Sequence, residues 1–546
     1  MKKILVVGLF IIGISEIASA QRLKKQDKAV IENLRNEIGY LASDKLEGRR
    51  TGTPGEKLAY EFIEEQFKNL KLIPKGDDDS YIQTFIINEG KQILPQTHLI
   101  INDNKLVSET DFFPFIFSAN GSITSDASPA LPEQGAPWFL DIKDLLEQNK
   151  DNPHFDIEDA IKNKAIDFAD KGANAVIVYN SGKADDELKF DGKEKIDPIK
   201  IPVIFLTTNA VSKYLNDKTS SYNIKLNIAL GKKERTAHNV IGFIDNGAPY
   251  TIIIGAHYDH LGYGEDHNSL WTGKPEIHNG ADDNASGTAA VIELARMLKN
   301  SKLKKNNYLF ICFSGEELGL FGSKYFTEHP TVSLSSTNYM INADMVGRLN
   351  DSTHTITIGG YGTSPEWSHA LEQKTKEFSV KFDSSGIGPS DHTSFYLKDI
   401  PVLFFFTGIH ADYHKPTDDV DKINLPGELY VIKYIYHVID ETNNDGKLAF
   451  LKTREPKMEA KRFTVTLGIM PDYTFDGKGV RADGIIDGKI AQKAGMKAGD
   501  VIIQLGDNQV TDLNTYMSAL SKFKKGDATT VTIVRDKNEM KFDIIF

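Results

Sequence analysis

The sequence predicts an α/β fold in which a mostly parallel mixed sheet is sandwiched by helices. The first observation is that apolar runs typical of internal strands alternate with helical segments from Asn239 onward. The second is that acids and histidines follow several of these runs, as Glu316-Glu317 follow Tyr308–Phe313. The third is the length of 546 residues, which exceeds what one hydrophobic core organises and therefore predicts additional domains.

The strands of this sheet are expected where short apolar runs are bounded by turn residues. They are Val240–Phe243, Tyr250–Ile254, Tyr308–Phe313, Tyr339–Ile341, Thr355–Ile358 and Val402–Phe406, with a helix at Gly287–Lys299. Cys312, the only cysteine, lies in one of these runs and is expected to be a small buried apolar residue. A single cysteine excludes an intrachain disulfide.

The N-terminus predicts export. Lys2-Lys3 precede the apolar run Ile4–Ile14 and the small residues Ala18-Ser19-Ala20, as in a signal peptide spanning residues 1–20. An uncleaved membrane anchor is the alternative, but the run is shorter than the ~20 residues that a span needs. No later segment predicts a membrane span, so we expect a periplasmic or secreted protein.

Changes in the predicted secondary structure along the chain divide the remainder into domains. Helical patterns cover residues 27–74, and short strands and turns follow to about residue 230, including Ala175–Tyr179, Ile201–Leu206 and a helix at Ala160–Lys171. The predicted parts are residues 21–96 and 234–451 for the catalytic domain, 97–233 for an insert, 452–462 for a charged linker and 463–546 for a compact C-terminal module.

The charge balance excludes one class of partner. Removal of residues 1–20 takes away two basic residues and one acidic residue, which leaves 62 basic against 75 acidic residues, a net charge of −13. Such an excess argues against nucleic acid or an anionic membrane surface as partner.

Six clusters of acids and histidines predict a metal site at the carboxyl edge of the sheet. They are His257–His260, Asp282–Asp283, Glu316–Glu317, Asp344, Asp391–His392 and Asp412–Asp418. Histidine and carboxylate without thiolate suit Zn²⁺ in a catalytic site. Two histidines and three acids can hold two ions about 3.5–4 Å apart with a bridging carboxylate and a shared water. Asp259, two residues after His257, suits an acid that orients the imidazole.

As a set, these residues resemble the aminopeptidase Y type of co-catalytic di-zinc exopeptidases, relatives of glutamate carboxypeptidase and glutaminyl cyclase. The match covers Asn239 to about Asp421 and the segment Leu41–Pro74. The resemblance implies two Zn²⁺ ions per site, Glu316 as general base and Tyr413 as the group that stabilises the oxyanion. The implied ligands, in the family's order, are His257, Asp282, Glu317, Asp344 and His414.

The bridging role is expected at Asp282 rather than Asp283, on the family pattern in which the first acid of Gly-Ala-Asp-Asp bridges and is followed by a cis peptide bond. No ligand role is expected for His260, His267, His278, His392 and His410. His392 is a candidate for contact with substrate.

The accessory segments resemble two known modules. Residues 97–233 resemble a protease-associated domain, and residues 463–546 resemble a PDZ domain. The backbone N–H groups of Leu467, Gly468 and Ile469 would hold a peptide C-terminal carboxylate in such a module. The alternative is a module that only packs on the catalytic domain.

The resemblance implies an exported aminopeptidase that acts on peptides with a free N-terminus. A carboxypeptidase or dipeptidase on the same scaffold is the nearest alternative. Glutaminyl cyclase activity is disfavoured by the complete set of five ligands. A peptide-binding relative without catalytic activity is disfavoured by the same ligands together with Glu316.

Overall fold

The structure is a computed structural model that describes residues 24–453 and 465–546, except for residues 151, 153–154, 185, 187, 193–195, 372–374, 472–476, 486–487, 512 and 536. The predicted signal peptide and residues 454–462 of the predicted linker lie outside the described residues. The chain divides into two compact units, one formed by residues up to Phe85 together with Ala237–Phe546, the other by Ile86–Thr236.

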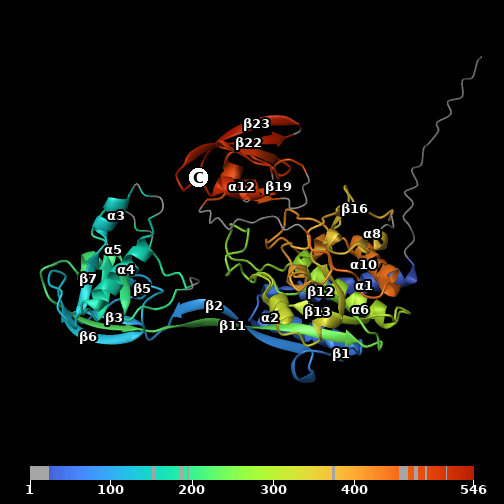
Figure 1. Ribbon diagram of the computed structural model, residues 1–546, viewed down its shortest axis with the longest axis horizontal. Helices are drawn as coiled ribbons and strands as arrows, with labels where there is room; N and C mark the ends of the chain where they lie inside the picture. Colours follow the sequence, from blue (N-terminus) through green and yellow to red (C-terminus); the bar gives the residue numbers. More distant parts are fainter. Residues whose placement is uncertain are drawn as a thin grey trace, which may run out of the picture. The chain divides into compact units, whose positions relative to one another are not determined.

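The first unit contains a nine-stranded mixed sheet with the order β1-β11-β13-β12-β14-β17-β15-β16, and β2 pairs with β11 (Figure 1). The strands are β1 (Ile73–Pro74), β2 (Ile82–Ile93), β11 (Leu230–Ile244), β12 (Thr251–His257), β13 (Asn307–Phe313), β14 (Thr337–Ala343), β15 (Thr355–Gly359), β16 (Ser379–Phe382) and β17 (Val402–Phe406). Strands β13, β12, β14 and β17 run parallel to one another, whereas β11 pairs antiparallel with β13 and β15 pairs antiparallel with β17. The carboxyl ends of four central strands therefore meet at one edge.

Helices cover both faces of this sheet. They are α1 (Lys25–Leu41), α2 (Pro54–Asn69), α6 (Gly287–Lys299), α7 (Phe321–Glu328), α8 (Trp367–Ala370), α9 (His392–Tyr396) and α10 (Leu425–Glu441). Ile252, Ile254 and Phe310 on one face share a core with α1, α2, α6 and α10. Ile253 and Leu309 on the opposite face share a core with residues of α7 and α9. The predicted α/β class, the strands and helix α6 are confirmed.

Continuous burial explains why these apolar runs form internal strands. Every residue of β12, β13 and β14 is buried, as expected for strands covered on both faces. Cys312 is fully buried within β13, which confirms its predicted place. Strand β12 continues three residues beyond the predicted Ile254, so that His257 is its last residue.

The second unit contains two four-stranded sheets. Their strands are β3 (His98–Ile101), β4 (Asn104–Lys105), β6 (Gly121–Ala127) and β10 (Tyr222–Ile228) in one sheet, and β5 (Phe112–Pro114), β7 (Pro137–Asp141), β8 (Ala175–Tyr179) and β9 (Val203–Leu206) in the other. Its helices are α3 (Lys143–Asn149), α4 (Ile157–Asp170) and α5 (Thr208–Tyr214). The unit contains the whole of the predicted insert 97–233, and its likeness to a protease-associated domain stays a prediction.

The C-terminal module has its own sheet and core. The sheet order is β18-β19-β20-β22-β23, with β21 paired to β20. Its elements are β18 (Ile469–Pro471), β19 (Val480–Ile485), α11 (Ile490–Lys493), β20 (Val501–Leu505), β21 (Asn508–Gln509), α12 (Leu513–Leu520), β22 (Ala528–Arg535) and β23 (Asn538–Ile545). Val465, Leu467, Ile502, Val531 and Ile533 belong to this core.

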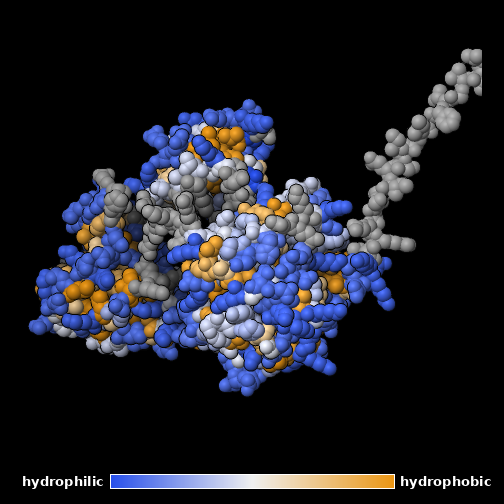
Figure 2. Space-filling model, turned by 45° about the vertical axis from the view of Figure 1, so that its right-hand side comes forward, coloured by the Kyte–Doolittle hydropathy of each residue, from blue (hydrophilic) through white to orange (hydrophobic). Residues whose placement is uncertain are grey.

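Hydrophilic residues cover most of the surface drawn in Figure 2. Among the described helices, none combines the length and the apolar character required to cross a bilayer.

Candidate metal centre

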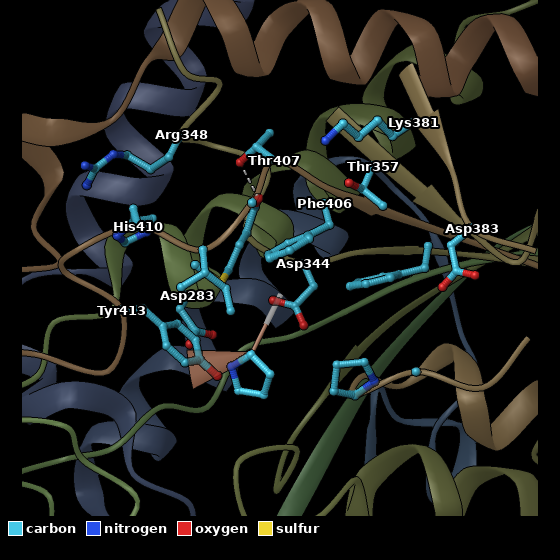
Figure 3. Close-up of a pocket in the computed structure, with 18 of the residues that line it drawn as sticks. Asp283, Asp344, Arg348, Thr357, Lys381, Asp383, Phe406, Thr407, His410 and Tyr413 are labelled. Atoms are coloured by element: carbon cyan, nitrogen blue, oxygen red, sulfur yellow. Dashed lines mark hydrogen bonds between the residues drawn. The ribbon is translucent and has the colours of Figure 1, made fainter. Parts of the chain in front are cut away.

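The predicted acids and histidines converge where the parallel strands end. His257 closes β12, Glu316 and Glu317 follow β13, and Asp344 follows β14 directly. Asp283 belongs to the loop that opens α6. These side chains line one pocket together with Tyr413 and His414, which lie beyond β17 (Figure 3). The sheet topology thus brings together segments that are far apart in the sequence.

One group of acids surrounds His257. Its Nε2 lies 3.4 Å from Asp283 Oδ1, 3.4 Å from Asp344 Oδ1 and 3.9 Å from Glu316 Oε2. Its Nδ1 lies 3.2 Å from the backbone oxygen of Asp259. Because that oxygen can only accept, Nδ1 donates to it, and Nε2 is the nitrogen that faces the acids and would give up its proton to a metal ion. This nitrogen is therefore available to a metal ion.

A second group surrounds Glu317. His414 Nε2 lies 3.2 Å from Asp283 Oδ2 and 3.2 Å from Glu317 Oε2. His414 Nδ1 donates to the backbone oxygen of Asn268 at 2.9 Å, which again leaves Nε2 as the free ligand atom.

His260 also belongs to this cluster, although the sequence predicted no role for it. Its Nδ1 donates to Glu317 Oε1 at 2.7 Å, and the three side chains His260, Asp283 and Glu317 have the spacing of a metal site. We assign the ligand position to His414, because its Nε2 faces both acids whereas the nearest nitrogen of His260 is used in orienting Glu317. The spacing of His257 and His260 in the sequence does not indicate which histidine would bind metal and which would orient an acid.

The two adjacent acids of the motif, Asp282 and Asp283, have different surroundings. Asp283 places one oxygen near Nε2 of His257 and the other near Nε2 of His414, whereas the carboxylate of Asp282 is bonded by other residues. The Asp282 carboxylate accepts from the Gly347 N–H at 2.7 Å and from the Ser286 hydroxyl at 3.0 Å, and it lies 3.2 Å from His410 Nε2. The cis peptide bond joins Asp283 to Asn284, so it follows the second acid of the motif and not the first.

Asp259 lies behind the cluster and joins two of its segments. It accepts from the Thr51 hydroxyl at 2.9 Å and from the Glu316 N–H at 3.2 Å, and its Oδ1 is 3.8 Å from His257 Nδ1. Burial raises the pKa of Asp259 to about 7. Asp259 thus contacts both the Glu316 backbone and the His257 ring, and its orienting role stays a prediction.

The charges of the cluster are balanced by histidines in the metal-free chain. Burial opposes ionisation of Asp283, but hydrogen bonds to His257 and His414 hold its pKa well below the usual range. Burial also opposes ionisation of Glu317, yet His414 and His260 lower its pKa to about 2. Metal ions would replace the protons of these histidines, as expected when imidazole and carboxylate become ligands.

Glu316 differs from the acids around it. Burial raises its pKa well above the usual value; His257 opposes this shift, and Glu317, Asp344 and Asp391 add to it. A carboxyl group that readily holds a proton suits a general base that must later return that proton.

Tyr413 lies against the second group. Its ring stacks on His414 with centroids 3.9 Å apart. Burial and the acids Asp283, Glu317, Glu316 and Asp344 raise the pKa of Tyr413 well above 10. The hydroxyl therefore keeps its proton and can donate it in a hydrogen bond.

Two further residues position the cluster. The Ser390 hydroxyl donates to Asp344 Oδ2 at 2.7 Å and accepts from Asn342 Nδ2 at 2.7 Å. Asp418 accepts from the backbone N–H groups of Asp282 and Asp283, each at 3.0 Å. Asp418 ends one of the predicted clusters and Ser390 directly precedes another, but the local sequence does not indicate the hydrogen bonds that these two residues make to other segments.

A groove leads from the cluster across the outer strands. Figure 3 shows Phe406 lying between Asp344 and the pair Thr357 and Lys381. The register of the sheet places Thr357 opposite both Phe406 and Lys381. His392 lines the pocket, as predicted for a substrate-side residue, and stacks on Phe404 with centroids 4.5 Å apart. Burial lowers the pKa of His392 to about 3, so the ring is neutral and extends the aromatic wall.

Comparison with known proteins agrees with this geometry. Residues 239–439 match peptidase family M28, and residues 466–545 match the PDZ domain. Over 283 residues the chain is 26% identical to "Aminopeptidase YwaD" of Bacillus subtilis, which covers 48% of this chain and 55% of that protein. Over 196 residues it is 30% identical to "Leupeptin-inactivating enzyme 1" of Streptomyces exfoliatus, which covers 34% of this chain and 39% of that protein.

A third relative is "Probable lipoprotein aminopeptidase LpqL" of Mycobacterium tuberculosis, with 26% identity over 291 residues, 47% of this chain and 54% of that protein. The chain thus spans about half the length of these relatives, or less. The matched segment 239–439 contains His257, Asp283, Glu316, Asp344 and His414. Residues 239–439, which include this cluster of acids and histidines, are therefore similar to peptidase family M28, and residues 466–545 are similar to a PDZ domain.

Proposed function

We propose that the protein is a zinc-dependent aminopeptidase that hydrolyses N-terminal residues from peptides. The observation that carries the proposal is the position of Asp283, with one carboxylate oxygen near Nε2 of His257 and the other near Nε2 of His414. A carboxylate shared between two histidines, each beside another acid, has the form of a two-metal site.

The donor set fits two Zn²⁺ ions. His257 and Asp344 would hold one ion, Glu317 and His414 the other, and Asp283 would lie between them. No thiolate is present in the cluster, and both imidazoles present a free Nε2, as expected for catalytic zinc. When bound, two zinc ions lower the pKa of a shared water to near neutrality.

The protein's own groups complete the reaction. Glu316 accepts a proton from the attacking water and returns it to the leaving amine. The Tyr413 hydroxyl donates to the oxygen that gains negative charge at the scissile carbonyl. Asp259 holds the backbone of Glu316 and the ring of His257 in place.

The groove beside Asp344 would receive the side chain of the first residue. His392, Phe404 and Phe406 form an aromatic wall on one side of it, which favours large apolar side chains over small ones. Lys381 and Asp383 lie at the far end. A carboxypeptidase or dipeptidase is the second candidate. Arg348 favours it, because this arginine lines the pocket and would attract the carboxylate of a substrate.

The remaining assignments are part of the same proposal. Residues 1–20 would direct export to the periplasm or the exterior. In the PDZ domain, the segment Leu467–Ile469 would bind a peptide C-terminus. The Gly468 N–H donates to the Thr466 hydroxyl oxygen at 3.0 Å, and a peptide carboxylate would have to replace that hydroxyl.

Replacement of the general base tests the proposal. Glu316→Gln should keep both zinc ions, because Glu316 is not among the proposed ligands, and should lower kcat about 10²–10⁴-fold. The matched control is Glu61→Gln, which changes an exposed glutamate on α2 and should leave kcat unchanged. Zinc content is measured by atomic emission and kcat with an aminoacyl 4-nitroanilide. Full activity of Glu316→Gln would contradict the assignment.

A further inference from the structure

The first unit buries a basic side chain whose function is not explained by the peptidase mechanism. Arg49 ends the short helix η1 (Asp44–Arg49), and its side chain is fully inaccessible to solvent. Among the described residues of this unit, no other lysine or arginine is buried. An arginine in such surroundings needs partners for five N–H donors.

The partners of Arg49 are backbone oxygens of three separate segments. Nε donates to Tyr258 at 2.8 Å, one terminal nitrogen donates to Leu41 at 2.7 Å and also to Asn279, and the other donates to Gly280 at 3.0 Å. None of these acceptors is a carboxylate. The guanidinium group therefore connects pieces of backbone.

Two of these segments carry the proposed ligands. Tyr258 lies between His257 and Asp259, and Asn279-Gly280 precede the loop that contains Asp283. One side chain thus links the end of β12 to the start of the bridging loop. The third segment, at Leu41, is the end of α1 and provides an anchor outside the site.

The charge of Arg49 is placed behind the acids of the site. Burial lowers its pKa to about 10, and Asp283, Asp259, Asp418 and Glu317 oppose this decrease. Arg49 therefore remains charged at neutral pH. A permanent positive charge reduces the repulsion among these carboxylates in a way that does not depend on histidine protonation.

We propose that Arg49 is a positioning residue of the two-metal site. It fixes the separation of His257 and Asp283 through the backbone and supplies a fixed cation behind the acids, so that the ligands are arranged before metal binds. The inference rests on the proposed zinc site. It assigns a specific function to the segment Asp44–Arg49, which precedes the matched segment of the peptidase family.

Lysine cannot replace this arginine. A lysine ammonium is one nitrogen with three donors, whereas the planar guanidinium reaches four oxygens from three nitrogens. Arg49→Lys keeps the charge and loses the links between segments; Arg49→Met loses both.

The test measures zinc binding and the visible spectrum of the Co²⁺-loaded protein, because both report ligand geometry without turnover. Competition with a chromophoric chelator should show zinc affinity reduced at least about tenfold in both Arg49 variants, as is typical when a residue supporting metal ligands is lost. The Co²⁺ absorption bands should shift in both variants. Arg49→Lys is included because it is the milder change and should fold if Arg49→Met does not.

Arg296→Met is the matched control. Arg296 is a partly buried arginine on α6 that pairs with Glu293 at 2.6 Å and Glu37 at 2.9 Å, away from the ligand segments. Its loss should lower the unfolding temperature and leave zinc affinity unchanged. Unchanged zinc affinity and Co²⁺ bands in folded Arg49→Lys would overturn the inference. Failure of the parent chain to bind two zinc ions would overturn the proposed function instead.

Discussion

At the scale of single residues, the proposed metal centre depends on which of two adjacent loop acids, Asp282 or Asp283, faces His257 and His414. The clusters of histidine and carboxylate at strand ends and the family resemblance together predicted His257, Glu316, Glu317, Asp344 and His414 as site residues, and the structure brings all five to one pocket. Adjacent acids in a loop point in opposite directions, however, and only the backbone conformation decides which one faces the histidines. We therefore propose the bridging position for Asp283, whereas Gly347 and Ser286 bond the carboxylate of Asp282.

The two acids provide a direct test of this assignment. Asp283→Asn should lower zinc content from two ions toward one or none, because the shared ligand loses its charge. Asp282→Asn should retain two ions, since its contacts are to backbone, Ser286 and His410. Zinc per chain is measured after dialysis at pH 7.5. Loss of zinc in Asp282→Asn with retention in Asp283→Asn would restore the original prediction.

A second prediction concerns a buried acid away from the metal site. Burial and the neighbouring Glu293 raise the pKa of Glu37 from 4.5 to about 8, while Arg296 opposes the shift. Because the folded state binds the proton more tightly than the unfolded state, stability falls as pH rises from about 4.5 to 8. Glu37→Gln should therefore be more stable than the parent chain at pH 8 by roughly 1 kcal/mol or more, and the difference should shrink toward pH 5.

The measurement is urea unfolding of both proteins in chelator at pH 5 and pH 8. Glu32→Gln, which changes an exposed residue of the same helix, serves as control and should show no such pH dependence. A difference that grows toward pH 5 would contradict the raised pKa.

At the scale of elements, continuous apolar runs were sufficient to predict the central strands. β16 was not predicted, because Ser379–Phe382 is mostly exposed and mixes polar with apolar residues. Helix α10 was also missed, although Asn424 caps its first turn by accepting from the Gly427 N–H and Pro426 lies within that turn. That signal was present in the sequence.

The loop before α6 depends on a glycine. Gly280 has a φ of +56°, and a Cβ there would lie 2.2 Å from the Asp283 backbone oxygen and 2.4 Å from the His260 ring. Gly280→Ala should lower both the unfolding temperature and the zinc content, because the loop would have to move. Gly247→Ala is the control, since Gly247 also has a positive φ but has no atom within 4 Å of a Cβ. Equal zinc content in the two variants would contradict this prediction, because it would show that the chain accommodates the Cβ at position 280 without displacing Asp283.

At the scale of the whole molecule, changes in helix and strand pattern along the sequence predicted an insert and a C-terminal module in addition to the catalytic domain. The structure places a compact unit at Ile86–Thr236, and the PDZ match begins at residue 466. The boundaries of the insert could not be derived from the sequence, because β2 and β11 are each continuous strands that cross them.

Removal of metal should affect the whole peptidase domain. Zinc that binds only the folded chain stabilises it by about 2.7 kcal/mol when free zinc is 100 times Kd. Chelator should therefore lower the unfolding temperature of the parent chain, and added zinc should restore it. The Asp283→Asn variant is the control and should respond much less. An identical response of the two proteins would place the stabilising zinc elsewhere.

The account's central claim is that the cluster at Asp283 hydrolyses peptide bonds next to a free N-terminus. The most direct test is release of 4-nitroaniline from a panel of aminoacyl nitroanilides and their N-acetylated forms, with chelated protein and after zinc is restored. We predict zinc-restored cleavage of the unblocked substrates only, with large apolar side chains preferred. Cleavage of the N-acetylated forms, or no cleavage by protein that holds two zinc ions, would contradict the claim.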